Sequence, residues 1–349
     1  MKAVILLPDQ MDNWFQALSS EHQIFAPVKD DNNSAVTVWS KIKGWSELSL
    51  ADGPPTSSIK PFFFPQPETL FTFSAKWSDP EAFRLKEPKA VQIPTVLAGV
   101  RPCDSRSVML NSLPYKEDPY FQERMEAISI IGLTCTHQCS TCFCRWVGGS
   151  PLSTECMDVA LYPLKNGSGY IAEPITPKGE KLLEHAPEAR PLNDEETRFL
   201  KKLKENEEAE RAKIPEASHN LKEKDLMLLY EAPFWHNVAE TCINCGACTF
   251  LCPTCYCFDI QDETIHGKGR RIRYWDSCMF PLFTLHASGH NPRGQKFQRV
   301  RNRFMHKLKY FPDKFGPISC VGCGRCIKEC PVNIDIREVI REMLGAASK

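Results

Sequence analysis

The sequence lacks several features that would assign it to a common functional class. Its N-terminal apolar run covers only residues 3–7, which is too short for a signal-peptide core or a bilayer span. The 43 basic and 43 acidic residues cancel, so there is no overall attraction to nucleic acid or to anionic membranes. These absences predict a soluble, cytoplasmic protein with no membrane span and no nucleic-acid partner.

Nucleotide-binding and catalytic signatures are also missing. Neither G-x-G-x-x-G nor G-x-x-x-x-G-K-[ST] occurs in the sequence, and these motifs carry dinucleotide and triphosphate binding, respectively. No Ser/His/Asp or Cys/His arrangement stands out. We therefore predict no catalytic residue in this chain and no substrate chemistry by the chain alone.

Cysteine, in contrast, is abundant. The 349 residues include 17 cysteines, an odd number in closely spaced groups. Disulfides are rare in a reducing compartment, and clustered C-x-x-C spacings in such a chain indicate a metal site.

Two cysteine runs near the C-terminus share one pattern, C-x2-C-x2-C-x3-C-P. They contain Cys242, Cys245, Cys248 and Cys252, and Cys320, Cys323, Cys326 and Cys330. This is the bacterial ferredoxin spacing for [4Fe–4S] clusters. Zinc is the alternative, but zinc ribbons use C-x2-C pairs rather than these triplets.

The spacing also predicts crossed ligation. Three cysteines in a tight loop present thiolates to one cluster, whereas the fourth heads the next helix and reaches the other cluster. We expect cluster 1 to be bound by Cys242, Cys245, Cys248 and Cys330, and cluster 2 by Cys320, Cys323, Cys326 and Cys252.

The composition predicts an α+β chain with three parts. Residues 1–177 contain short β-rich runs (35–39, 62–65 and 94–100) and predict an α/β or mostly-β domain with an inserted Cys-rich loop. Residues 178–235 are heavily charged and predict a solvated helical linker, with Phe199, Leu200 and Leu203 as a thin apolar stripe. Residues 236–349 predict a two-cluster ferredoxin-like domain with a long insertion at 258–318.

Three further helices are expected in the last part. Trp235, Val238 and Ala239 indicate one helix before the first run, and Asp335 is a candidate cap for an amphipathic helix over residues 335–344. The third is indicated by apolar residues at helical spacing in a basic segment, namely Phe297, Val300, Phe304 and Leu308.

The basic segment itself has several interpretations. Residues 267–310 hold eleven Lys or Arg and one acid, Asp276. Nucleic-acid binding is one interpretation. We favour the interpretation that these cations stabilise an anionic cluster and raise its reduction potential. A basic surface would also attract an acidic redox partner. An ordinary solvated helix face is the alternative to this docking surface.

Several motifs together resemble one family in order along the chain. They are "FFFPQPETLF" (62–71), "GVRPCD" (99–104), "CFC" (142–144), "CPTCYCF" (252–258), "WDSC" (275–278), "ASGHNPR" (287–293) and "CVGCGRCI" (320–327). The set is similar to iron–sulfur subunits typified by the beta subunit of cytoplasmic sulfhydrogenase and by the iron–sulfur subunit of anaerobic sulfite reductase. The resemblance covers roughly residues 60–349.

The resemblance implies an electron-transfer subunit of a cytoplasmic oxidoreductase complex. It implies two partners, a flavin-containing reductase subunit together with a metal-containing catalytic subunit, the latter being a hydrogenase, a sulfite reductase or a heterodisulfide-reductase-like enzyme. Cys255, Cys257 and Cys278 also match the family's pattern. We assign them no role beyond burial.

A third [4Fe–4S] cluster is predicted for the Cys-rich loop. Cys103, Cys135, Cys142 and Cys144 match the cysteine positions of the family that this chain resembles, and we expect these four to bind the third cluster. Cys142 and Cys144 would point the same way from an extended strand, and Cys103 would come from a separate loop. Asp104 is a candidate helix cap and Arg101 a candidate counter-charge. Cys139 and Cys156 are then spare thiols, with Cys139 the first substitute ligand; packing of all these cysteines without metal is the alternative.

A different function is also compatible with this loop. Cys135, Cys139 and Cys142 have the C-x3-C-x2-C spacing of radical S-adenosylmethionine enzymes. However, Thr141 replaces the aromatic residue that usually precedes the last cysteine, and the strand–helix alternation of the corresponding barrel is missing.

Overall fold

The N-terminal half is built on one mixed sheet. The computed structural model describes residues 2–33, 36–49, 53–88, 93–186, 188–214 and 224–346. Within these residues the sheet has eight strands in the order β3-β2-β5-β6-β7-β8-β1-β9. Their bounds are β1 Val4–Leu6, β2 Gln23–Lys29, β3 Thr37–Ile42, β5 Thr95–Val100, β6 Ile128–Leu133, β7 Val159–Pro163, β8 Tyr170–Pro174 and β9 Arg190–Pro191. Strands β2, β5, β6 and β7 are parallel, and the flanking pairs are antiparallel.

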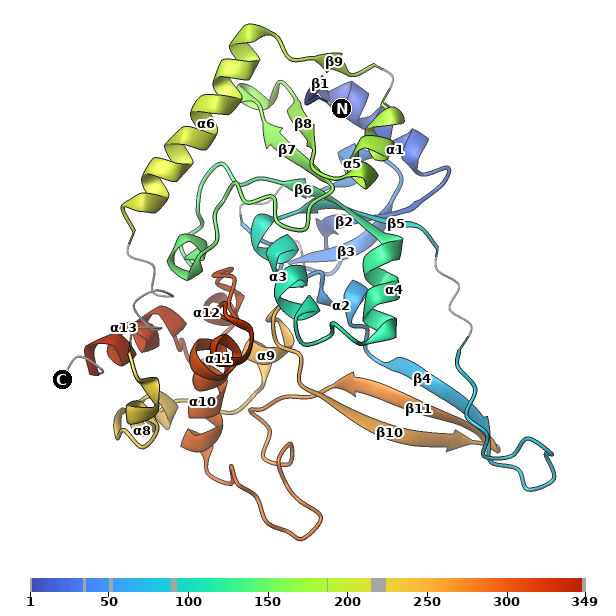
Figure 1. The fold of residues 1–349 in the computed structure, drawn as a ribbon, viewed down its shortest axis with the longest axis vertical. Coiled ribbons are helices and arrows are strands. Elements are labelled where there is room, and N and C mark those ends of the chain that lie inside the picture. The colour runs from blue at the N-terminus through green and yellow to red at the C-terminus, as the bar shows by residue number, and fades with distance from the viewer. Residues whose placement is uncertain are drawn as a thin grey trace.

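Apolar cores cover both faces of this sheet. Side chains alternate along the strands, so that Ile130 belongs to one core and its neighbour Ile131 to the other. Burial on both faces explains the nearly continuous apolar runs of the central strands. The covering helices are α1 Pro8–Leu18, α2 Lys60–Phe63, α3 Pro102–Ser112, α4 Pro119–Ala127, α5 Pro177–Glu184 and α6 Asp194–Ala212 (Figure 1). The domain is therefore α/β rather than mostly β, and the expected strand at 62–65 is wrong because these residues lie in and after helix α2.

The charged segment is helical as predicted, but it packs on the first domain. Strand β9 pairs with β1 at the sheet edge. Leu200 of α6 is buried in the core on one sheet face, with Phe199 and Leu203 packed against it. The side chain of Lys204 in α6 donates to Glu173 of β8 at 2.8 Å. The apolar stripe thus attaches this helix to the sheet, and residues up to Ala212 do not form a free linker.

A second, three-stranded sheet extends from the lower part of the molecule (Figure 1). It has the order β10-β11-β4, with β4 Glu68–Ser74, β10 Phe258–Ile265 and β11 Lys268–Trp275, all antiparallel. The insertion between the two cysteine runs therefore begins as a hairpin, and this hairpin pairs with a strand from the first domain.

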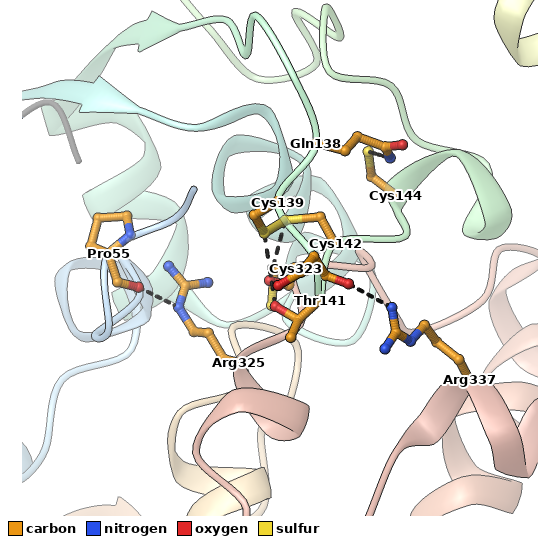
Figure 2. Close-up of a disulfide and its surroundings, with 10 residues drawn as sticks. Pro55, Gln138, Cys139, Thr141, Cys142, Cys144, Cys323, Arg325 and Arg337 are labelled. Atoms are coloured by element: carbon orange, nitrogen blue, oxygen red, sulfur yellow. Dashed lines mark hydrogen bonds between the residues drawn. A yellow bond between two sulfur atoms is a disulfide. The ribbon is translucent and has the colours of Figure 1, made fainter. Parts of the chain in front are cut away.

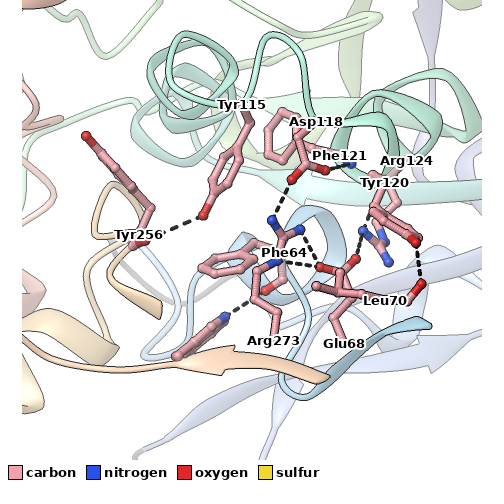
Figure 3. A network of polar contacts seen from close by, with 11 residues as sticks. Phe64, Glu68, Leu70, Tyr115, Asp118, Tyr120, Phe121, Arg124, Tyr256 and Arg273 are labelled. Atoms are coloured by element: carbon pink, nitrogen blue, oxygen red, sulfur yellow. Dashed lines mark hydrogen bonds and ion pairs between the residues drawn. The ribbon is translucent and has the colours of Figure 1, made fainter. Parts of the chain in front are cut away.

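A buried ionic network fixes this sheet to the first domain (Figure 3). Arg273 of β11 donates to Glu68 of β4, with its Nε at 2.8 Å, and to Asp118, which caps helix α4. Arg124 of α4 also pairs with Glu68. Glu68 and Trp275 belong to two of the motifs quoted above, and the Trp275 indole donates to the Phe64 carbonyl at 2.9 Å. These motif residues therefore hold the two sheets together.

The C-terminal part is helical and surrounds the cysteine runs. Its helices are α8 Phe234–Glu240, α9 Ala247–Phe250, α10 Lys296–Met305, α11 Phe311–Phe315, α12 Arg325–Lys328 and α13 Ile336–Ala346, with a π-helical segment His306–Tyr310 after α10. The three predicted helices are confirmed: the expected apolar residues of α8, α10 and α13 share one core. Asp335 accepts a hydrogen bond from the Arg337 N–H at 2.8 Å, as a cap should. None of the helices in the described part of the chain combines the length and apolar character that crossing a bilayer demands.

Candidate metal centres

The first site draws on both cysteine runs. Cys242, Cys245, Cys248 and Cys330 line one cavity with an empty volume of about 440 Å³. Three of them come from the loop before α9 and from its start, and Cys330 follows α12 at the end of the second run. This is the set expected for crossed cluster 1, brought together around one space.

The second site shows the reciprocal arrangement. Cys320, Cys323 and Cys326 lie in the loop before α12 and at its start, and the charge of Cys252 acts on each of them. Burial is the main reason why the pKa of each of these three thiols is raised. The fourth cysteine of the first run therefore faces the second run.

The two runs have the same backbone conformation. Asn244 and Gly246 in the first run, and Gly322 and Gly324 in the second, have φ between 57° and 78°. The N–H of Asn244 lies 3.5 Å from Sγ of Cys242, and the N–H of Gly322 lies 3.5 Å from Sγ of Cys320. Left-handed residues at alternate positions turn the backbone N–H groups toward the cysteines. The matching geometry explains why the two runs share one sequence pattern.

The donor set fits an iron–sulfur cluster better than a single ion. Among the described residues, no three Cys, His, Asp or Glu side chains converge closely enough to hold one metal ion. Zinc draws its thiolates to about 2.3 Å from one centre. A four-iron cube needs four thiolates spread around a larger body, and four cysteines line the first cavity.

Buried cations accompany the cysteines. Lys60, Arg303 and Lys307 are each at most 5 % exposed, and among the described residues none forms a salt bridge with an Asp or Glu. Lys307 Nζ lies 3.3 Å from Sγ of Cys252 and 3.1 Å from the Ser319 carbonyl oxygen. Lys60 Nζ lies 3.7 Å from the Trp275 ring centroid, and burial lowers the pKa of Lys60 to about 8.

These cations correct one part of the sequence interpretation. A solvated or docking face was one expectation for the basic segment, and it fails for four of its side chains: Arg299, Arg301, Arg303 and Lys307 are buried, whereas Lys268 and Arg270 are exposed. The alternation of apolar and basic residues does not distinguish a basic face exposed to solvent from a basic face that lines a buried site, because both have helical periodicity. Cations beside a cluster, the interpretation favoured from the sequence, agree with this placement.

The third group of cysteines lies at one edge of the main sheet. Strands β5 and β6 are parallel neighbours, so the segments after Val100 and Leu133 leave the sheet at the same edge. The first segment carries Cys103 and the second carries the Cys-rich loop. Cys103, Cys135, Cys139, Cys142 and Cys144 line one cavity with an empty volume of about 370 Å³. All four predicted ligands are thus together, with Cys139 as a fifth cysteine and Cys323 of the second run as a sixth.

The local geometry of this loop differs from the expectation. Cys103 lies in the first turn of helix α3 rather than in a loop, because Pro102 starts the helix. Cys144 begins a 3-10 helix, Cys144–Val147, so Cys142 and Cys144 do not share an extended strand. The Arg101 side chain also lines the cavity and acts on Cys135, which agrees with its proposed role as a counter-charge.

Cys139 and Cys142 are joined by a disulfide (Figure 2). In this state Cys142 is not a free thiolate, so a cluster bound by Cys142 requires the reduced form. The same bond occupies two of the three cysteines of the radical-enzyme interpretation. The main sheet, moreover, is open, with β3 and β9 at its ends, and is not the barrel of those enzymes. Cys156 lies outside this cavity, packed against an apolar core.

Asp104 does not cap helix α3 and instead forms a buried ion pair. Both of its carboxylate oxygens accept hydrogen bonds from Arg325 at 2.7 Å, and both side chains are almost fully buried. Arg325 also donates to the Pro55 carbonyl oxygen at 2.8 Å (Figure 2). Arg325 belongs to the second cysteine run, so this pair connects the third site to the second. Sequence reasoning missed the pair, since nothing local indicates a partner 221 residues away.

Two thiol pairs involve the remaining cysteines: Cys255 lies beside Cys252, and Cys257 lies beside Cys278, which is near Cys248 of the first site. The Cys252 thiolate accepts from Cys255, and Cys257 accepts from Cys278, which lowers the pKa of Cys257 to about 7. Burial was the only role expected for Cys255, Cys257 and Cys278; Cys278 is buried, and the other two are half-buried.

These features define an iron–sulfur protein: an α/β domain joined to a ferredoxin-like domain whose two cysteine runs meet at two sites. Residues 241–334 match the family model of the 4Fe-4S dicluster domain. The chain is 29 % identical over 354 residues to sulfhydrogenase 2 subunit beta from Pyrococcus furiosus, with 98 % of each chain covered. No solved structure matches the chain. Both matches support an iron–sulfur subunit of the kind that the sulfhydrogenase beta subunit represents.

Proposed function

We propose that this chain relays electrons within a cytoplasmic multi-subunit oxidoreductase, between two partners: a flavin-containing reductase subunit, which exchanges electrons at one end, and a metal-containing catalytic subunit at the other. The observation that carries the proposal is the cavity shared by three cysteines of one run and Cys330 of the other. Bound [4Fe–4S] clusters would supply one-electron transfer at such sites. The relative's name, sulfhydrogenase 2 subunit beta, makes a hydrogenase the first candidate for the catalytic partner.

The spatial order of the sites supports a relay. Cys245 in the first site is exposed, whereas Cys320 and Cys323 in the second are buried. Cys323 and Gly322 of the second run also line the cavity of the third group. The second site therefore lies between the other two, and the first reaches the surface. A chain with this order would accept electrons at one end and pass them on at the other.

A third [4Fe–4S] cluster, bound by Cys103, Cys135, Cys142 and Cys144, is part of the proposal. Its support is that these residues line one cavity next to the second run. The pKa values of Cys103 and Cys135 are raised, mainly by burial, so these thiols would lose their protons only when a cation such as iron binds them. Cys139 would remain free once its disulfide with Cys142 is reduced.

Iron content tests the number of clusters. Anaerobically purified protein should hold about twelve irons per chain for three cubes, or about eight for two, and no flavin. Cys144→Ser should lose only the third cluster, or about four irons, whereas Cys156→Ser is the matched control that should lose none. Zinc in place of iron would reject the proposal as a whole, and full iron in Cys144→Ser would reject the third ligand set.

Purification from the native host tests the partners. The chain should copurify with a flavoprotein and a metal-containing catalytic subunit, and reduced flavoprotein should bleach the cluster absorption near its visible maximum. Isolation as a free monomer that turns over a small substrate would contradict the relay function.

A further inference from the structure

Arg303 is a buried cation with no acidic partner among the described residues. Its side chain is 5 % exposed and lies in the last turn of helix α10. Within the same part of the chain, neither its Nε nor its Nη2 has a hydrogen-bond acceptor. An unpaired charge in a protein interior costs several kcal/mol, so this guanidinium requires an anion that the polypeptide does not provide.

The position of Arg303 indicates which anion. Its side chain lines the first cavity together with Cys242, Cys245, Cys248 and Cys330. Burial opposes its charge, but Cys248 of the first site and Cys326 and Cys252 of the second hold the pKa of Arg303 above its usual value. Arg303 therefore lines the first site and is close enough to the second site for the charges of Cys326 and Cys252 to act on it.

Two other cations on the same stretch of chain face elsewhere. Lys307, one turn later, contacts Cys252 and acts on Cys320, both of the second site. Arg301 is equally buried, but its guanidinium donates to the Tyr230 carbonyl at 2.7 Å and to Glu231 at 3.2 Å, and it stacks on the Tyr230 ring. The three buried cations of this segment therefore differ in their surroundings. Arg303 is near both sites, Lys307 contacts only the second site, and Arg301 is bound to groups outside the two sites.

We propose that Arg303 is a shared positioning residue that offers unpaired N–H donors to the first cluster and stabilises the reduced state of both clusters. The inference rests on the proposed function, because it assigns Arg303 a role toward clusters at these sites. Each reduction adds one negative charge, and a nearby cation in a low-dielectric interior favours the more negative state. Hydrogen bonds to cluster sulfurs act in the same direction. A single side chain thus raises two potentials.

Redox titration of the holoprotein, followed by electron paramagnetic resonance and visible absorption, tests this role. Arg303→Met should weaken reduction of both clusters at least tenfold, which for a one-electron couple is about 59 mV downward. Lys307→Met should lower the second-site potential alone, and Arg301→Met should lower neither. Cys330→Ser and Cys144→Ser, which remove ligands of the first and third sites, assign the redox steps to their clusters.

The conservative variant separates charge from hydrogen bonding. Arg303→Lys keeps the charge but loses the planar fork of donors, so its potentials should lie between those of the wild type and Arg303→Met. Should Arg303→Met fail to assemble, Arg303→Lys must still lower the first-site potential relative to Arg301→Lys. Wild-type potentials in Arg303→Met, or a shift equal to that of Arg301→Met, would overturn the role of Arg303. Wild-type protein without iron would instead reject the proposed function.

Discussion

The two halves of this chain are stabilised in different ways. The N-terminal sheet buries apolar side chains on both faces, such as Leu97 on one and Val96 on the other. The C-terminal core mixes apolar residues with cysteines and lies against three buried cations. Apolar burial stabilises the first half by itself. In the second half, thiolates and cations require a bound cluster, so folding and metal binding are linked.

Removal of iron should therefore have the largest effect on folding, and it should affect the two halves differently. Chelation under anaerobic, reducing conditions is expected to unfold the region around α9, α10 and α12 and leave the main sheet folded. Hydrogen exchange followed by mass spectrometry should show lost protection in peptides from 242–252 and 320–330, and retained protection in β5 and β6. Equal loss in both halves would show that the first domain depends on the clusters as well.

Cys330→Ser sharpens the comparison inside the second half. Crossed ligation predicts loss of the cluster held with Cys242, Cys245 and Cys248, or about four irons, although Cys330 belongs to the other run. The measurement is iron content together with the spectrum of the remaining cluster. Cys252→Ser is the matched variant and should damage the site with Cys320 instead. If each variant damages the cluster of its own run, the crossing is wrong.

The sequence predicted the parts of the fold that have a local signal. The two runs, the helices around Trp235 and Val339, and the helix after Lys296 all follow from spacing and periodicity. Tertiary partners have no such signal. The ion pair of Asp104 with Arg325, the attachment of α6 through Leu200, and the inward direction of Arg303 each depend on which distant segment packs alongside. If the parallel pairing of β5 and β6 were known from the sequence, it would place Cys103 beside Cys135.

Asp104→Asn tests the contact between the halves. Loss of the carboxylate charge leaves the buried Arg325 guanidinium without an acidic partner among the described residues, and breaking such a pair costs about 3–5 kcal/mol. The free energy of unfolding from urea denaturation of the holoprotein is the measurement. Glu338→Gln breaks the exposed pair with Arg341 and should cost under about 1 kcal/mol. Similar costs for the two variants would mean that the buried pair adds no stability.

Leu200→Ala is expected to have the smallest effect and to locate the boundary between the halves. Leu200 is 9 % exposed at the edge of its core, so truncation should cost about 2 kcal/mol, the low end for a buried leucine. Lys201→Ala, on the solvated side of the same helix, should change the free energy of unfolding by less than about 0.5 kcal/mol. Equal values would make α6 the solvated linker that its charge suggested. The cost of Leu200→Ala should also persist after iron is removed, because α6 packs on the sheet that needs no cluster. The cost of Asp104→Asn should disappear under that condition, since Arg325 lies in the region that unfolds.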